Sequence, residues 1–165
     1  MVGMRRRRLR CMLEPATEGG KAMNYIKIQL EAIKALAKGD TVAAYRDDDV
    51  ICLTYDRATM YRIPDSQFYI KLNVQADGNK FFAKANEGIR VQDTWQRVQC
   101  GRKLLARYTT GQMDVWIDTN LLRLFDKDCK LIVTGPKDPV FVMEYACIAG
   151  LVMPCKDPHN AQQDN

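Results

Sequence analysis

The sequence predicts a single-domain α+β protein in which short helices pack on an antiparallel sheet. The first observation is the order of patterns, because a helical segment is followed by short apolar strands and turns, and this order occurs twice. The second is composition, since 47% hydrophobic and 27% charged residues suit an ordinary globular domain. A core of normal size is therefore expected. No apolar run reaches the roughly 18 residues that a membrane span needs.

Residues 26–38 carry the pattern of an amphipathic helix, and Gly39 ends it. One face repeats apolar side chains at helical spacing and is expected to pack on the core: Ile26, Leu30, Ile33 and Ala37. The opposite face is mildly basic and is expected to be solvated: Lys27, Glu31, Lys34 and Lys38.

Three strands follow this helix. Residues 41–45 and 50–55 predict a β-hairpin around the turn at 46–49, and residues 59–63 predict a third strand that ends at Pro64. The turn contains three adjacent aspartates, Asp47 to Asp49, but neighbouring side chains in a strand point to opposite faces. We therefore interpret them as turn residues and not as a metal site.

The second unit repeats this order. Residues 115–117 predict a strand, and Asp118 or Thr119 can cap a short helix that runs to about Asp126. Three strands are expected after this helix, at residues 130–134, 140–145 and 148–153.

The middle segment, residues 65–113, has no counterpart in this pattern. Residues 68–74 alternate like a strand, and residues 95–108 fit either a helix or two short strands. The second stretch holds the densest basic group of the body: Arg97, Arg102, Lys103 and Arg107. Beside Trp95 and Tyr108, this group predicts either a basic contact to nucleic acid or a partner, or a solvated face over a buried tryptophan.

The net charge of +5 is concentrated at the N-terminus. Residues 1–22 contain six basic and two acidic residues, a net charge of +4, whereas residues 23–165 have a net charge of +1. The first segment is expected to be a flexible basic leader, either an arm for phosphate backbones or an extension upstream of a start at Met23. Residues 157–165 are expected to form a polar tail after a domain at 23–156.

Few residues suited to catalysis or metal binding are present. The chain has one histidine, His159, and its six cysteines show no CxxC spacing. There is no glycine-rich phosphate loop and no GxSxG motif. We therefore expect a non-enzymatic cytoplasmic protein with free thiols, and with no cofactor, metal site, catalytic residue or membrane partner.

Two stretches carry a family resemblance. Residues 115–156, VWIDTNLLRLFDKDCKLIVTGPKDPVFVMEYACIAGLVMPCK, run from a strand through a short helix into three strands that end at Met153-Pro154. This ending resembles the bacterial DNA sliding clamps, the beta subunits of DNA polymerase III. Residues 53–63, LTYDRATMYRI, are similar to the threonine-aspartate-glycine-histidine-arginine segment of that family, with Tyr55 and Asp56 in place of aspartate and glycine and Arg57 in place of histidine.

The resemblance implies a DNA-clamp-like fold and a role as a processivity or accessory factor in DNA replication or repair. In this family, helix faces line a ring and meet the DNA backbone without reading sequence. Here the DNA-facing residues would be Lys27, Lys34, Lys38, Arg123 and Lys127. A hydrophobic pocket that takes linear peptides of polymerases and repair proteins would be walled by Thr54, Tyr55, Met60, Pro139, Val140, Leu151, Met153 and Pro154.

Rings of this family contain six such domains, whereas this chain has room for one. It is therefore expected either to assemble as a homo-oligomer around DNA or to act as a partner-binding module of phage or mobile-element origin. The nearly neutral body favours the module. The alternative hypothesis is a small mobile-element protein that binds and inhibits a host nucleic-acid enzyme through the basic stretch at 97–107 or through residues 1–22.

Overall fold

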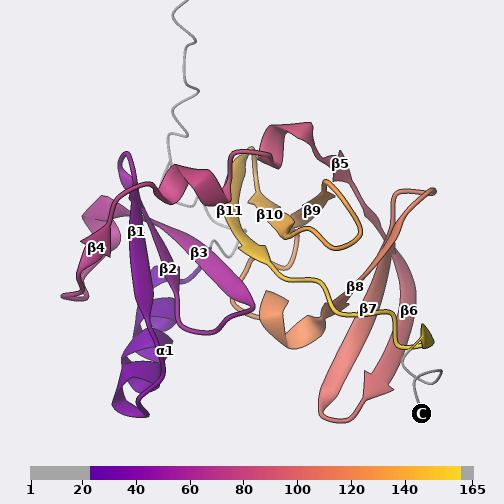
Figure 1. Cartoon of the computed structure of the whole chain (residues 1–165), viewed down its shortest axis with the longest axis horizontal. Coiled ribbons are helices and arrows are strands. Elements are labelled where there is room, and N and C mark those ends of the chain that lie inside the picture. Colours follow the sequence, from indigo (N-terminus) through magenta and orange to yellow (C-terminus); the bar gives the residue numbers. More distant parts are fainter. Residues whose placement is uncertain (1–22, 161–165) are drawn as a thin grey trace, which may run out of the picture.

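The computed structural model describes residues 23–160, which form an α+β fold (Figure 1). Within this part of the chain, one α-helix, α1 (Tyr25–Ala37), and four short 3-10 helices accompany eleven strands. The predicted fold class is thereby confirmed. The expected leader, residues 1–22, and residues 161–165 of the expected tail lie outside the described residues.

An eight-stranded sheet forms the body of the molecule. Its order is β4-β1-β2-β3-β11-β10-β9-β5, and every pairing is antiparallel except that of β1 with β4. The strands of this sheet are β1 (Ala43–Asp47), β2 (Val50–Thr54), β3 (Thr59–Pro64), β4 (Val74–Gln75), β5 (Ile89–Arg90), β9 (Lys130–Val133), β10 (Val140–Glu144) and β11 (Cys147–Val152). The strands predicted on both sides of residues 65–113 are therefore present, with ends shifted by one or two residues.

The large sheet consists of two similar halves. α1 precedes β1, β2 and β3, and the 3-10 helix η4 (Thr119–Leu122) precedes β9, β10 and β11. The last strands of the two halves, β3 and β11, pair antiparallel with Met60 opposite Leu151. The order of elements that the sequence repeats is thus built as two units joined along one strand pair.

The two faces of this sheet bury different hydrophobic clusters. In β10, Val140 belongs to the larger cluster, which also contains Ile28 of α1, whereas Phe141 belongs to the smaller cluster. Phe81 and Phe82 pack on the smaller cluster from the segment that holds η2 (Gly78–Phe81) and η3 (Ala85–Glu87). Because successive strand residues point to opposite faces, this segment covers the face opposite to α1.

The prediction of which side of α1 faces the core is wrong. Ile26, Leu30 and Ile33 are between 48% and 53% exposed, and Ala37 is exposed as well. The fully buried side chains are instead Ile28 and Ala32. The expected solvated face is confirmed for its three lysines, which are exposed, while Glu31 is half-buried.

Two features of its packing explain this orientation of α1. The small side chains of Ala32 and Ala35 let the helix lie close to the sheet. Gln29 is also buried, because its Nε2 donates to the Gln67 carbonyl at 2.9 Å and its Oε1 accepts from the Tyr69 N–H at 2.7 Å. The helix therefore packs on the sheet through a narrow side and leaves Ile26, Leu30 and Ile33 about half exposed.

The segment after β3 and η1 (Asp65–Gln67) is mostly irregular, so the strand expected at 68–74 is wrong. Phe68, Ile70 and Leu72 do alternate onto the larger cluster, which explains the sequence pattern. Their backbone lies outside the strand ladders, and only Val74–Gln75 pair, as β4 beside β1.

Residues 92–118 form a separate three-stranded antiparallel sheet. Its order is β6 (Gln92–Cys100), β7 (Lys103–Thr109) and β8 (Asp114–Asp118). The two-strand alternative for residues 95–108 is therefore confirmed. The helix expected from Asp118 to about Asp126 is shorter than predicted, since Asp118 caps only the 3-10 turn η4 by accepting from the Asn120 N–H at 3.0 Å.

Two further findings concern cysteines and membranes. Cys147 is disulfide-bonded, which corrects the expectation of free thiols at that position, whereas Cys52, Cys100, Cys129 and Cys155 are free. None of the helices formed by residues 23–160 has the length and apolar character needed to cross a bilayer.

Candidate functional site

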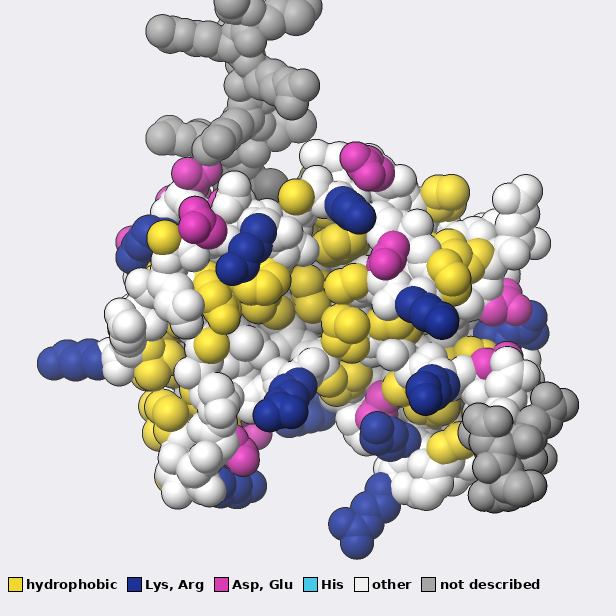
Figure 2. Space-filling model, in the orientation of Figure 1, with side chains coloured by type: hydrophobic (Ala, Val, Ile, Leu, Met, Phe, Trp, Pro, Cys, Tyr) yellow, Lys and Arg dark blue, Asp and Glu magenta, His cyan; other side chains and the backbone are white. Residues whose placement is uncertain are grey.

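A groove of about 1010 Å³ opens where the two halves of the large sheet meet, on the face of the smaller cluster. Figure 2 shows hydrophobic side chains gathered across the middle of the molecule, with lysines and arginines around them. The groove is lined by residues 39–41, Ala43, Tyr45, residues 54–60, Lys80, Phe81, Ala83, Lys84, Thr134, Asp138, Pro139, Phe141, Leu151 and Met153.

The floor of the groove is apolar. Met60, Phe141 and Leu151 are nearly fully buried and come from three strands of the sheet, β3, β10 and β11. Met153 lies just after β11 and is 36% exposed, so its flexible thioether is available at the surface of the groove. This floor favours apolar side chains from a ligand.

An aromatic wall stands beside this floor. The rings of Tyr45 and Phe81 meet edge to face with centroids 4.8 Å apart. The Lys80 ammonium lies 5.4 Å from the Tyr45 centroid and 5.1 Å from that of Phe81, so a cation–π contact holds it over both rings. Two of these residues belong to the middle segment, which therefore completes the groove.

The β2–β3 turn forms a second, rigid wall. Asp56 Oδ1 accepts from the Ala58 N–H at 2.9 Å and from the Thr59 N–H at 2.6 Å, so the turn itself engages this carboxylate. The Met153 N–H donates to the Ala58 carbonyl at 2.7 Å and ties the end of β11 to the turn. Thr59 Oγ1 is buried with no hydrogen-bond partner among the described residues.

Charges of both signs lie around the groove. Arg57 and Lys84 line it together with Lys80, and Asp40 and Asp138 provide carboxylates. Asp138 accepts a hydrogen bond from the Thr134 hydroxyl at 3.1 Å. The site therefore combines an apolar floor with a polar border, an arrangement typical of surfaces that hold amphipathic ligands.

The structure brings together six of the eight residues expected to wall a peptide pocket. Thr54, Tyr55, Met60, Pro139, Leu151 and Met153 line the groove. Val140 does not, because it is fully buried in the larger cluster on the other face of the sheet, and Pro154 is not part of the lining. That a peptide binds in this groove stays a prediction.

The expected DNA-facing residues lie on the other side of the sheet. Glu31 joins the two helical elements there, since its carboxylate lies 3.7 Å from Lys34 Nζ and 3.7 Å from an Arg123 guanidinium nitrogen. Lys27, Lys38 and Lys127 are exposed, so all five predicted cations occupy accessible positions around α1 and η4. Their contact with DNA also stays a prediction.

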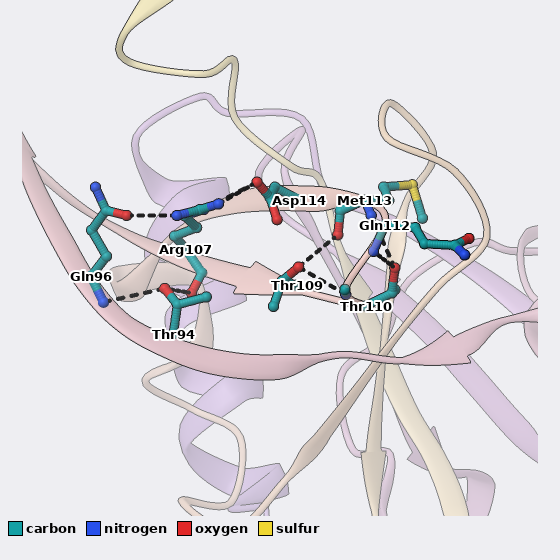
Figure 3. Close-up of polar contacts among 9 residues, drawn as sticks. Thr94, Gln96, Arg107, Thr109, Thr110, Gln112, Met113 and Asp114 are labelled. Carbon is teal, nitrogen blue, oxygen red and sulfur yellow. Dashed lines mark hydrogen bonds and ion pairs between the residues drawn. The ribbon is translucent and has the colours of Figure 1, made fainter.

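In the second sheet, two of the four cations of the alternative basic group form ion pairs and the other two are exposed. Arg97 pairs with Asp93 at 2.7 Å and Arg107 pairs with Asp114 at 2.5 Å, so two of its four cations are neutralised locally. Figure 3 shows Arg107 held between Gln96 and Asp114. Arg102 and Lys103 are exposed around the β6–β7 turn.

Two further observations concern metal ligands and thiols. Within residues 23–160 no group of three or more His, Cys, Asp or Glu side chains is placed to hold a metal ion. Burial raises the pKa of the Cys52 and Cys129 thiols to about 11, so both are protonated at neutral pH. Comparisons with family models, curated proteins and solved structures give no match.

The sequence signal for the groove was incomplete. Met60 and Met153 were found through the family resemblance, but Tyr45, Lys80 and Phe81 were missed. The adjacent aromatic pair Phe81-Phe82 was the available signal, because two large rings in a polar stretch require burial somewhere. Nothing in the sequence places Phe81 beside Tyr45 of β1.

Proposed function

We propose that this chain is a non-enzymatic, sliding-clamp-like accessory factor of DNA replication or repair that binds a short linear peptide of a partner protein in its groove. The observation that carries the proposal is the groove itself, an apolar floor at the junction of two similar half-domains. The duplicated order of helix and three strands, with β3 paired to β11, supports the clamp-like part of the proposal.

The surface of the groove fits a peptide with several apolar side chains. Met60, Leu151 and Met153 offer an apolar, adaptable floor, and thioethers pack around ligands of different shapes. A volume of about 1010 Å³ exceeds that of most small-molecule sites, which favours a ligand of several residues.

The surface of α1 supports peptide binding in the groove over encirclement of DNA. Ile26, Leu30 and Ile33 form an exposed apolar stripe beside the α1 lysines, and Glu31 offsets part of the positive charge there. A surface of this kind is less suited to sliding along phosphates than a uniformly basic one. Partner binding is therefore the primary activity we assign to the domain.

The test is peptide selection on the full chain. A displayed library of random peptides is selected on the protein, and the best peptide is labelled for fluorescence anisotropy. Met153→Asp places a carboxylate over the apolar floor and is expected to weaken binding by about tenfold or more. Leu104→Asp is the matched control, because Leu104 is similarly exposed on β7, outside the groove. Equal affinity of the selected peptide for both variants would refute the assignment of the groove.

A further inference from the structure

Trp95 is displayed in an unusual way on the second sheet. Its side chain is 82% exposed, and its backbone has φ of +63°, a left-handed conformation that is unfavourable for a bulky residue. The register of β6 against β7 shifts between Asp93 and Arg97, so Trp95 lies in an irregular bulge of that strand. Bulges of this kind redirect a side chain away from the normal alternation.

Neighbouring polar groups hold this conformation. Asp93 Oδ1 accepts from the Trp95 N–H at 2.7 Å, and both Asp93 oxygens accept from Arg97 at 2.9 and 2.7 Å. Thr94 donates to the Arg107 carbonyl at 2.9 Å, which anchors the bulge to β7 (Figure 3). The Arg97 guanidinium lies 5.9 Å from the indole centroid, within cation–π range. The indole is thus prearranged in solvent.

The segment that carries Trp95 is polar and has an excess of positive charge. Residues 89–114 contain five basic and two acidic residues, a net charge of +3. Both acids are engaged by Arg97 and Arg107, which leaves exposed Arg90, Arg102 and Lys103 toward the two ends of β6. Arg90 lies in β5, Arg102 in the β6–β7 turn and Lys103 at the start of β7, so at roughly 3.3 Å per residue they are at most about 15 to 25 Å from the indole.

This arrangement favours a nucleic acid over a protein partner. A tryptophan that anchors a protein interface normally lies within an apolar patch, whereas the neighbours of Trp95 along β6 are Asp93, Thr94, Gln96 and Arg97. Interfaces with nucleic acids are more polar and more positively charged. Bases of a duplex are already stacked, so a free indole selects unpaired bases.

We propose that β6 binds single-stranded nucleic acid, with a base stacked on Trp95 and the backbone phosphates near Arg102, Lys103 and Arg90. This activity is independent of the groove on the large sheet. Because the interaction uses stacking and charge, it is tolerant of base sequence and weakens with salt.

The test is binding of a labelled oligothymidylate of about twelve nucleotides to the full chain at low salt. The protein has two tryptophans and Trp116 is nearly fully buried, so quenching of the exposed indole reports contact at Trp95. Trp95→Gly is expected to weaken binding about 10- to 100-fold and Trp95→Phe by much less, because only the first removes the stacking ring. Charge reversal of Arg102 and Lys103 lowers affinity and flattens its salt dependence.

Tyr145→Gly is the matched control. Tyr145 is 72% exposed and also has positive φ, +56°, so both glycine variants remove an exposed ring and relieve backbone strain. Both are expected to raise the melting temperature by a few degrees, and only Trp95→Gly loses binding. Unchanged affinity in Trp95→Gly, absence of binding, equal affinity for a duplex, or a selected peptide that requires Trp95 would each overturn the proposal.

Discussion

Separate alanine variants of Ile28 and Leu30 measure which side of α1 supports the fold. Ile28 is fully buried, so its truncation removes about three carbon groups from the core and leaves a cavity, a loss of about 3 kcal/mol in unfolding free energy. Leu30 is half exposed, so only about half of the transfer free energy is lost, and alanine is the better helix former. The expected loss for Leu30→Ala is below about 1 kcal/mol.

Urea unfolding at equilibrium checks this difference, with circular dichroism and the fluorescence of buried Trp116 as independent probes. Ile33→Ala serves as a second variant of the exposed side and is expected to behave like Leu30→Ala. A larger loss for Leu30→Ala than for Ile28→Ala would refute the orientation of α1 and the exposure of its apolar stripe.

Two further predictions concern the junction of the halves and a buried carboxylate. Gly150→Ala is expected to lower the unfolding free energy by about 1 to 3 kcal/mol, because a Cβ there would overlap the Met60 carbonyl and lie 2.9 Å from the Phe125 ring, and differential scanning calorimetry would measure the loss. Glu144 has a pKa raised above its ordinary 4.5, chiefly by burial, so the folded state binds more protons and stability falls as pH rises from 4.5 through the raised value. Glu144→Gln is expected to flatten this pH dependence in urea midpoints, and an unchanged slope would contradict it.

The strands were predictable where local pattern and long-range structure agree. β10 alternates between the two clusters, and β11 does so apart from the register shift opposite Val142 and Met143; both are bounded by turn residues, so periodicity locates them. The same rule failed for residues 68–74, because their alternating apolar side chains pack on the core without a neighbouring strand for most of their backbone. An alternating pattern indicates that the side chains on one side of a segment are buried. It does not indicate whether the backbone of that segment pairs with a neighbouring strand.

The orientation of α1 was unpredictable for a different reason. Hydrophobicity ranks Leu30 and Ile33 above Ala32 and Ala35, whereas close packing on a sheet favours the small side chains. Gln29 donates to the Gln67 carbonyl and accepts from the Tyr69 N–H, and because these residues are about 40 positions away, no local sequence pattern indicates the contacts. A polar side chain thus decided which side of the helix is buried.

The groove was partly predictable because its floor and its wall have different origins. Met60 and Leu151 face each other across the β3–β11 pair, so recognition of two repeated units is enough to place them together. The wall formed by Lys80 and Phe81 depends instead on how η2 docks on β1. Gly78 permits this close approach, because a Cβ at that position would lie 2.9 Å from the Arg46 carbonyl oxygen. The sequence contains no pattern that predicts this contact between η2 and β1.

The exposed stripe of α1 also bears on the choice between a ring and a module. In a ring, Lys27, Lys34 and Lys38 would face phosphates, and Leu30 and Ile33 beside them would face the same hydrated channel. Those apolar side chains would gain nothing from DNA, since phosphate contacts supply the affinity. On a module they provide an apolar contact area on the side of the sheet opposite to the groove. The burial pattern of one helix therefore supports the proposed partner-binding module over encirclement of DNA.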